Sequence, residues 1–202
     1  TESSRDFDLI FKCLNMVRDE IAANMPYKVV YIPNVEADDI IGTLVEQTQE
    51  FGQHEDIMII SADKDFIQLQ KYGNVKQYSP MTKKFIKDDN PHSYLFEHVL
   101  KGDSSDGIPN VLSGDDTFVE SIRQSPMTKK KIQEYVDNAE NLESYMTAEV
   151  YRNYKRNQLL VDLSYVPTEI KKSIIDTSEA VKVPHRMKIL NYLIKNRCKL
   201  LI

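Results

Sequence analysis

The stretch Ile57-Met58-Ile59-Ile60-Ser61-Ala62-Asp63-Lys64-Asp65-Phe66 joins an apolar run to two carboxylates. The run 57–60 has the length and composition of a buried strand. Asp63 and Asp65 therefore follow the carboxyl end of that strand, and residues two apart in an extended chain share one side. In open α/β sheets, ligands bind at this edge. The stretch predicts an α/β fold with a polar site at the rim of its sheet.

Two further acidic clusters flank this stretch, Glu36-Ala37-Asp38-Asp39 before it and Asp103-Ser104-Ser105-Asp106 after it. Each cluster alone has a plainer interpretation, as acids of a first helical turn or as turn and cap residues. All three, however, stand at the ends of predicted elements in the same half of the chain. Seven converging carboxylates would repel one another without a cation. We therefore predict a shared divalent metal site.

Mg²⁺ prefers hard oxygen ligands, and two such ions about 4 Å apart can activate a water and stabilise the leaving oxygen of a phosphodiester. Asp63 and Asp65 would be central and could bridge the two ions. The first cluster would serve one side, and Asp103 with Asp106 the other.

Composition sets the broad class of protein. The chain has 202 residues, 41% of them hydrophobic, which is enough for a real core. The formal charge of −5 comes from the acidic clusters, and the remaining surface is mildly basic. Two distant cysteines, Cys13 and Cys198, favour a reducing cytoplasm. No apolar run approaches the ~18 residues that span a bilayer, so we expect no membrane contact.

Apolar periodicity predicts helices and strands in alternation through the first half of the chain, which implies parallel strands with crossover helices. Predicted strands are 28–32 and 57–60, followed by a hairpin of 75–78 with 84–87. Predicted helices are 7–21, 35–50, 91–101, 128–138, 147–160, 168–175 and 186–199. We expect two domains, an α/β core at 1–115 with the acidic site and a helical region at 116–202 for DNA binding or partner docking.

The three acidic motifs together resemble those of a known family. Glu36–Asp39, Ser61–Leu69 and Gly102–Pro109 occur in the order and spacing of the structure-specific 5′-nucleases. These include flap endonucleases, phage 5′-exonucleases and the 5′-nuclease domains of bacterial DNA polymerase I. The phage ribonuclease H branch is the most similar, and the likeness covers nearly all of the chain. Its further shared stretches are Lys71–Gln77, Ser79–Met81, Tyr151–Lys155 and Leu160–Pro167.

The resemblance implies a PIN-like α/β nuclease core with a central, mostly parallel sheet, plus a C-terminal helical region. It implies a 5′→3′ exonuclease and flap endonuclease that acts on duplex DNA and RNA–DNA hybrids and removes replication primers. The expected cofactor is a pair of Mg²⁺ ions, for which Mn²⁺ could substitute. A single-stranded DNA-binding protein and a sliding clamp are the expected protein partners. The protein would be a monomer in the cytoplasm of a phage-infected bacterium.

The resemblance also assigns roles to residues. Glu36, Asp38, Asp39 and Asp63 would belong to one Mg²⁺ sphere. Asp65, Asp103 and Asp106 would belong to the second, some through water. Within this set the catalytic residues would be Asp38, Asp39, Asp63 and Asp65. Metal-bound hydroxide would be the nucleophile.

The basic residues expected to contact DNA phosphates are Lys64, Lys129, Lys130 and Lys131. For each of these lysines a solvated surface position is an equally good interpretation, because a run of charges reads no sequence.

The sequence departs from the family at two places. Family members begin with a strand that carries another metal-binding Asp, followed by a basic helical arch. This sequence starts after that arch, so we expect it to be the C-terminal two-thirds of the enzyme, with weak metal binding, poor cleavage and an exposed sheet edge. After Pro109, the acidic segment Asn110–Asp116 replaces a glycine-rich hairpin that grips duplex phosphates, so this grip is expected to differ in detail.

Two other functions are compatible with the acidic motifs. A phosphohydrolase would use Asp63 as covalent nucleophile and Asp65 as acid. Such enzymes place their motif on the first strand, whereas here a strand and an acidic helix precede it. Alternatively, a non-catalytic module of the same fold would only contact DNA or replication proteins.

Overall fold

The computed structural model describes residues 6–50 and 55–201. The chain divides into two compact units, one made of Thr1–Val35 with Lys172–Ile202 and the other of Glu36–Lys171. The boundary expected near residue 115 falls inside the second unit. The division of roles between 1–115 and 116–202 stays a prediction.

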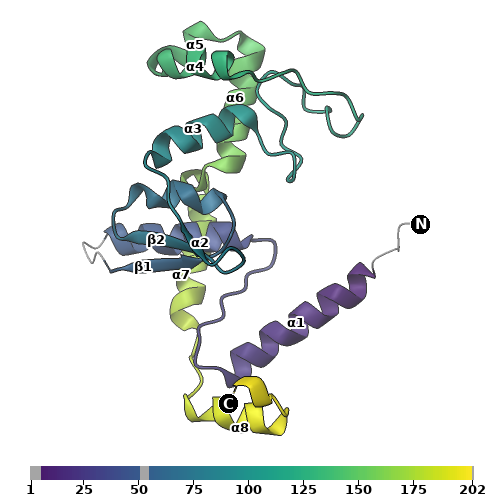
Figure 1. Cartoon of the computed structure of the whole chain (residues 1–202), viewed down its shortest axis with the longest axis vertical. Coiled ribbons are helices and arrows are strands. Elements are labelled where there is room, and N and C mark those ends of the chain that lie inside the picture. Colours follow the sequence, from purple (N-terminus) through teal and green to yellow (C-terminus); the bar gives the residue numbers. More distant parts are fainter. Residues whose placement is uncertain (1–5, 51–54, 202) are drawn as a thin grey trace. The chain divides into compact units, whose positions relative to one another are not determined.

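The second unit contains a three-stranded sheet in the order β1-β2-β3, with β1 at Ile57–Ile60, β2 at Val75–Ser79 and β3 at Lys84–Ile86. β1 pairs with β2 in parallel, and β2 pairs with β3 antiparallel as the predicted hairpin. Helix α2 (Ala37–Glu50) lies beside this sheet (Figure 1). The crossover from β1 to β2 contains a 3₁₀ segment, η1, at Asp65–Lys71. The α/β class is confirmed, with a small mixed sheet where a mostly parallel one was expected.

Two strand predictions need correction. Residues 28–32 form no strand. A strand exists only through its ladder bonds, and among the described residues no ladder to this segment occurs. In β1 only Ile59 is buried, at 5% exposure, whereas Met58 and Ile60 are 49% and 69% exposed. The apolar run thus has one covered face rather than two.

One hydrophobic core joins the sheet to α2. Val45 of α2 packs with Ile59, Phe66, Leu69 and Val75, which come from β1, η1 and β2. Gly42 lies one turn before Val45, and a Cβ placed there would come within 3.1 Å of Leu163. A glycine therefore lets the short 3₁₀ segment η3 (Leu163–Tyr165) pack closely on α2.

Helix α3 (Pro91–Lys101) has the end signals that its sequence contains. The Asn90 side chain accepts a hydrogen bond from the Ser93 N–H at 3.1 Å, and Pro91 occupies the first turn. Gly102, at φ +65°, follows its last residue. Both predicted ends of this helix are confirmed.

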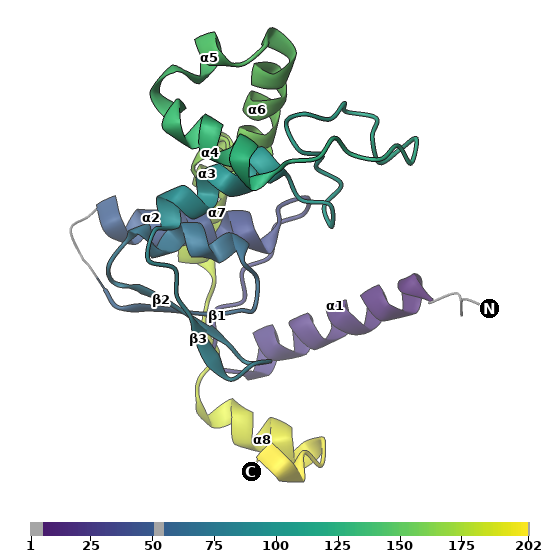
Figure 2. The same cartoon turned by 45° about the horizontal axis from the view of Figure 1, so that its top comes forward.

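A second core lies between α3 and the helices that follow it, α4 (Lys129–Asp137), α5 (Leu142–Tyr145) and α6 (Ala148–Val161). Figure 2 shows these three helices gathered together. A short 3₁₀ segment, η2 (Ala139–Asn141), links α4 to α5. The fully buried side chains of Leu100 and Val111 are at the centre of this core, which also contains Ile132, Tyr135, Leu142 and Met146.

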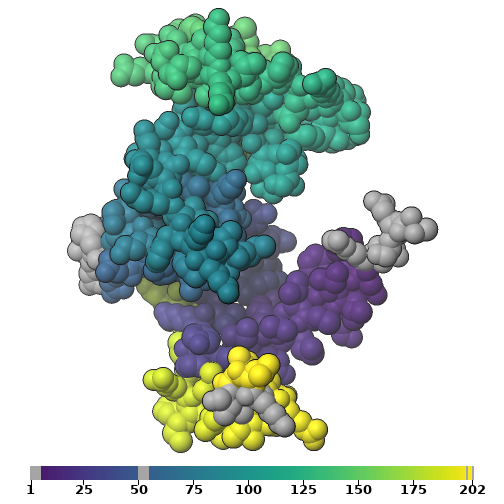
Figure 3. All heavy atoms as spheres, viewed as in Figure 1, coloured from purple at the N-terminus to yellow at the C-terminus, as the bar shows by residue number. Residues whose placement is uncertain are grey.

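The first unit contains α1 (Phe7–Asn24), α8 (Met187–Lys195) and the 3₁₀ segment η4 (Lys199–Leu201). Helix α7 (Thr168–Ala180) runs from the second unit into the first. The predicted helices are confirmed, with α7 five residues longer than expected and α8 shorter. The purple helix α1 (Figure 3) has no buried residue, and Phe7, Phe11 and Leu14 are 58–60% exposed. Within the described residues, no helix is both long and apolar enough to cross a bilayer.

Candidate metal centre

The acidic clusters lie together in the second unit. One carboxylate oxygen each from Asp38, Asp63 and Asp65 can be chosen so that all three lie within 4.8 Å of one another. The same holds for single ligand atoms of Asp65, His98 and Asp103. Asp65 belongs to both groups. The arrangement therefore offers two adjacent positions for a cation, with Asp65 between them.

Local hydrogen bonds fix the turn that carries Asp63 and Asp65. The Asp65 N–H donates to Asp63 Oδ1 at 3.0 Å, and the Asp63 N–H donates to Ser61 Oγ at 3.1 Å. The Gln77 amide, 1% exposed, donates to the carbonyls of Ser61, at 3.1 Å, and of Asp63. Gln70 in turn donates to Gln77 Oε1 at 3.2 Å. The turn at the end of β1 is thereby tied to β2.

A glycine-dependent turn positions Asp103. Gly102 has φ +65°, and a Cβ there would overlap the carbonyls of Ile108 and Pro109. The Ile108 N–H donates to the Asp103 carbonyl at 2.7 Å, which closes the turn. Asp103 Oδ1 accepts from the Ser105 N–H at 2.8 Å and from the Ser105 hydroxyl. These bonds from Ser105 are the main reason that the pKa of Asp103 is lowered.

The electrostatic effects at the site link all seven carboxylates. Burial raises the pKa of Asp38 to about 6, and the other charges that raise it are Asp63, Asp65, Glu36 and Asp39. Burial also raises the pKa of Asp65, a shift opposed by His98 and reinforced by Asp63, Asp103 and Asp106. Among the described residues, no Lys or Arg forms an ion pair with any of the seven. The site carries excess negative charge that a divalent cation would neutralise.

The donor set fits the metal predicted from sequence. Asp38, Asp63, Asp65 and Asp103 are half-buried or at least accessible carboxylates on separate elements, and hard cations prefer such oxygens. Glu36 and Asp106 are exposed, and Asp39 is half-buried. These three contribute charge near the site without joining either group of close ligand atoms. Their roles as metal ligands stay predictions, as do those of the other four.

The lysines predicted to contact DNA are placed less informatively. Lys64 is exposed between Asp63 and Asp65. Lys129 and Lys130 are exposed on the first turn of α4. Lys131 pairs with Glu134 at 3.2 Å and lies 5.1 Å from the centre of the Tyr135 ring. Part of the charge of Lys131 is therefore engaged within its own helix.

His98 is the site residue that sequence reasoning missed. Its Nδ1 lies 3.5 Å from Asp65 Oδ1, and its Nε2 lies 3.4 Å from Asp103 Oδ2. The signal was available, because His98 stands on the last turn of α3, four residues after the inward-facing Tyr94 and just before the third acidic cluster. The two rings meet edge to face with centroids 5.9 Å apart.

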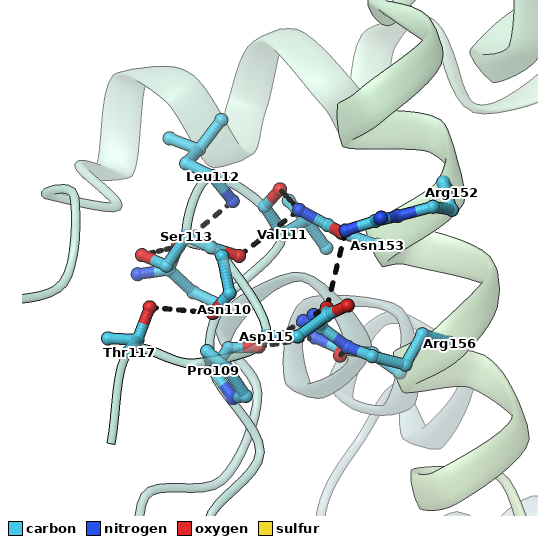
Figure 4. A network of polar contacts seen from close by, with 12 residues as sticks. Pro109, Asn110, Val111, Leu112, Ser113, Asp115, Thr117, Arg152, Asn153 and Arg156 are labelled. Atoms are coloured by element: carbon cyan, nitrogen blue, oxygen red, sulfur yellow. Dashed lines mark hydrogen bonds and ion pairs between the residues drawn. The ribbon is translucent and has the colours of Figure 1, made fainter. Parts of the chain in front are cut away.

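A polar network holds the segment that follows the third cluster (Figure 4). The buried Asn153 of α6 donates to the carbonyls of Val111 and Ser113, both at 3.1 Å. Asn157, one turn later and fully buried, donates to the carbonyls of Val99 and Pro109, both at 2.9 Å.

Two arginines beside these asparagines bind the same segment. Arg152, at 3.3 Å, and Arg156 both pair with Asp115. Arg156 also donates to the Pro109 carbonyl at 3.0 Å. The acidic segment Asn110–Asp116 is therefore held at Asp115 by two cations from α6.

Comparison with protein families gives two matches that together cover most of the chain. Residues 91–202 match the family described as T4 RNase H, C terminal. Residues 8–96 match the 5′-3′ exonuclease, N-terminal resolvase-like domain.

Individual relatives agree with these families. The ribonuclease H of Enterobacteria phage T4 is 37% identical over 199 residues, which cover 96% of this chain and 65% of the relative. The 5′-3′ exonuclease of Buchnera aphidicola (from Acyrthosiphon pisum) is 34% identical over 99 residues, 46% of this chain and 34% of the relative. This chain thus spans about two thirds of the length of the phage T4 relative.

Two solved structures share the fold. The T5 D15 protein, crystallised with metal ions, matches with a TM-score of 0.57 at 18% identity over 90% of this chain and 73% of its own. The T5 5′-exonuclease with bound zinc ions matches with a TM-score of 0.53 at 18% identity, over 88% and 72%. At this identity the likeness establishes the fold.

Proposed function

This chain belongs to the 5′-nuclease family that includes phage T4 ribonuclease H, and from that membership we propose that it carries the metal centre of a 5′→3′ exonuclease and flap endonuclease. The proposed substrates are duplex DNA and RNA–DNA hybrids with a 5′ end or flap, such as replication primers. The proposed reaction is hydrolysis of a phosphodiester bond.

The observation that supports this proposal most is the meeting of three distant acidic segments at one place. Asp38 precedes Asp63 by 25 residues and Asp103 by 65, yet Asp65 has close ligand atoms from both sides. Without a cation, such an arrangement costs free energy, as the raised pKa values of Asp38 and Asp65 indicate. A fold retains such a cost where function requires it.

Each carboxylate has a distinct proposed task. Asp38 and Asp63 would hold one Mg²⁺, and Asp65 would be shared with a second. The chemistry that such ions supply is activation of a water and stabilisation of the leaving oxygen. Glu36, Asp39 and Asp106 would orient bound waters. Mn²⁺ also fits these oxygen donors.

Substrate contact is proposed for basic side chains outside the acidic centre. Lys64, beside the carboxylates, would meet the phosphate nearest the scissile bond. Lys129, Lys130 and Lys131 would contact phosphates farther along the duplex. Such contacts are sequence-independent and weaken with salt. Contact with a single-stranded DNA-binding protein or a sliding clamp, and a location in the host cytoplasm, stay predictions.

A cleavage assay tests the proposal. The chain is incubated with a 5′-flap duplex in Mg²⁺ or in EDTA, beside an Asp63→Asn variant and a Glu149→Gln control, which changes an exposed acid on α6. We expect Mg²⁺-dependent release of 5′ products by wild type and control, and none by Asp63→Asn, which should still bind DNA. DNA binding without cleavage by the wild type would instead indicate a binding module. Hydrolysis of small phosphate esters alone would indicate the Asp63-nucleophile phosphohydrolase.

A further inference from the structure

The contacts of His98 raise a question of hydrogen-bond donors and acceptors. A neutral imidazole has one N–H donor and one acceptor nitrogen, but both ring nitrogens of His98 face carboxylate oxygens, Asp65 on the Nδ1 side and Asp103 on the Nε2 side. One of the two pairs therefore consists of facing acceptors, unless the ring is protonated. Facing acceptors need a cation between them.

Asp103 has the environment of an orienting carboxylate. Its Oδ1 already accepts the N–H and O–H of Ser105, and its Oδ2 faces His98 Nε2 at 3.4 Å. Histidines that bind metals usually donate their second N–H to such a carboxylate. With Nε2–H directed to Asp103, the Nδ1 lone pair faces Asp65.

The distance on that side fits two ligands of one ion. Nδ1 and Asp65 Oδ1 are 3.5 Å apart. A charge-assisted N–H···O bond is shorter, about 2.7–2.9 Å. Nitrogen and oxygen ligands with bonds of about 2.1 Å to a common tetrahedral ion are about 3.4 Å apart. The side chain of His98 is 13% exposed and lines a cleft of about 340 Å³ with Tyr94 and Asp88, so ions in solution can reach it.

We propose that His98 is a metal ligand through Nδ1, that Asp103 orients it through Nε2, and that the position shared with Asp65 therefore takes a transition-metal ion such as Mn²⁺, Co²⁺ or Zn²⁺ in preference to Mg²⁺. Imidazole favours these ions, whereas the oxygen-only group of Asp38, Asp63 and Asp65 suits Mg²⁺. This inference rests on the proposed function for the existence of the centre. It replaces the all-carboxylate second sphere expected from sequence with a mixed one.

Pulsed electron paramagnetic resonance of the whole chain with bound Mn²⁺ tests the nitrogen ligand directly. We expect ¹⁴N coupling from a coordinated imidazole in the wild type and in the His92→Gln control, which changes an exposed histidine on the first turn of the same helix. The coupling should be absent in His98→Gln. Wild type with bound Mn²⁺ but no ¹⁴N coupling, or coupling that persists in His98→Gln, would overturn the proposal.

Titration calorimetry with Co²⁺ and with Mg²⁺ tests the selectivity. His98→Gln should weaken Co²⁺ binding at least about 10-fold and Mg²⁺ binding less than about 3-fold. Equal losses for both ions would make His98 a counter-charge for the carboxylates and overturn the proposal. Circular dichroism checks that the variant is folded.

Asp103→Asn provides a second variant at the other end of the contact. It should keep the ¹⁴N coupling and lose about 10-fold in Co²⁺ affinity, as an orienting residue does. Complete loss of Mn²⁺ binding would instead make Asp103 the ligand and overturn its assignment. Failure of wild type to bind any of these ions would reject the metal centre itself, and with it the proposed function. A wild type that binds them without selectivity would reject only this inference.

Discussion

Two acidic regions of the second unit have opposite electrostatic surroundings. Asp115 is paired with Arg152 and Arg156 from α6, and Arg156 also bonds the Pro109 carbonyl. The carboxylates around Asp65 have no Lys or Arg partner in the described part of the chain, and only His98 lies within ion-pair distance. In one region the protein supplies its own cations, and in the other it does not.

This difference separates structural acids from functional ones. The pairs at Asp115 hold the segment after Pro109 against α6, so their charge is neutralised within the fold. Around Asp65 the mutual repulsion is retained and the pKa of Asp65 is raised. Removing a charge should therefore have opposite consequences in the two regions, with loss of function at Asp65 and loss of stability at Asp115.

The largest effect is expected for Asp65→Asn. The shared carboxylate is removed from both groups of ligand atoms, so flap cleavage should fall by about 10³-fold or more, equivalent to about 4 kcal/mol. The metal-free fold should be as stable as wild type, because a repelled charge is lost. Single-turnover cleavage and urea unfolding in EDTA measure the two quantities. Near-normal cleavage would show that Asp65 is not the shared ligand.

Asn157→Ala should have the next largest effect, on stability. The fully buried amide satisfies the carbonyls of Val99 and Pro109, which bracket the third acidic cluster. Leaving both without a donor should cost about 2–4 kcal/mol. Urea unfolding measures this cost, with Gln158→Ala, on the neighbouring half-buried residue, as the control. Equal small losses in both variants would mean that the network does not hold the cluster.

Asp115→Asn should destabilise the fold by about 1 kcal/mol, because Asp115 and Arg152 are both 60% exposed and solvent screens their pair. The loss should shrink in 1 M salt, where the Debye length falls to about 3 Å. Mg²⁺ affinity should not change. Unfolding at low and high salt checks the first point, and calorimetry the second. A loss of Mg²⁺ binding would contradict the separation of the two regions.

The smallest effect is a pH dependence at Asp38. Its pKa in the folded protein, about 6, lies above the ordinary 3.8, so the folded state binds a proton more tightly. Its contribution to stability is present below pH 3.8 and is lost as pH rises through about 6. In EDTA, Asp38→Asn should be more stable than wild type at pH 7, by less than about 1 kcal/mol after solvent screening, with no difference near pH 4. A larger difference at pH 4 than at pH 7 would contradict the sign.

Local signals predicted the elements that depend on local sequence. Asn90-Pro91 and Gly102 fix the ends of α3, and the alternating segments around Ser79–Thr82 fix the hairpin. The segment 28–32 has the composition of a strand, but a strand also needs a partner, which composition does not specify.

Contacts between distant residues were beyond sequence reasoning. His98 meets Asp65 from 33 residues away, and Asn157 meets the Val99 carbonyl from 58. A buried polar side chain that bonds distant carbonyls leaves no periodic pattern in the sequence. The convergence of the acidic segments was predictable because each follows the end of an element at one rim of the sheet. The engagement of Lys131 with Glu134, three residues on, was a local signal that could have been used.

The central claim is that carboxylates from three segments form one cation site around Asp65. Anomalous scattering from crystals of this chain grown with Mn²⁺ tests it most directly. We predict two peaks, both within bonding distance of Asp65, one beside Asp38 and Asp63 and the other beside His98. Peaks that lie on separate carboxylates with none at Asp65, or no ordered Mn²⁺ at millimolar concentration, would contradict the claim.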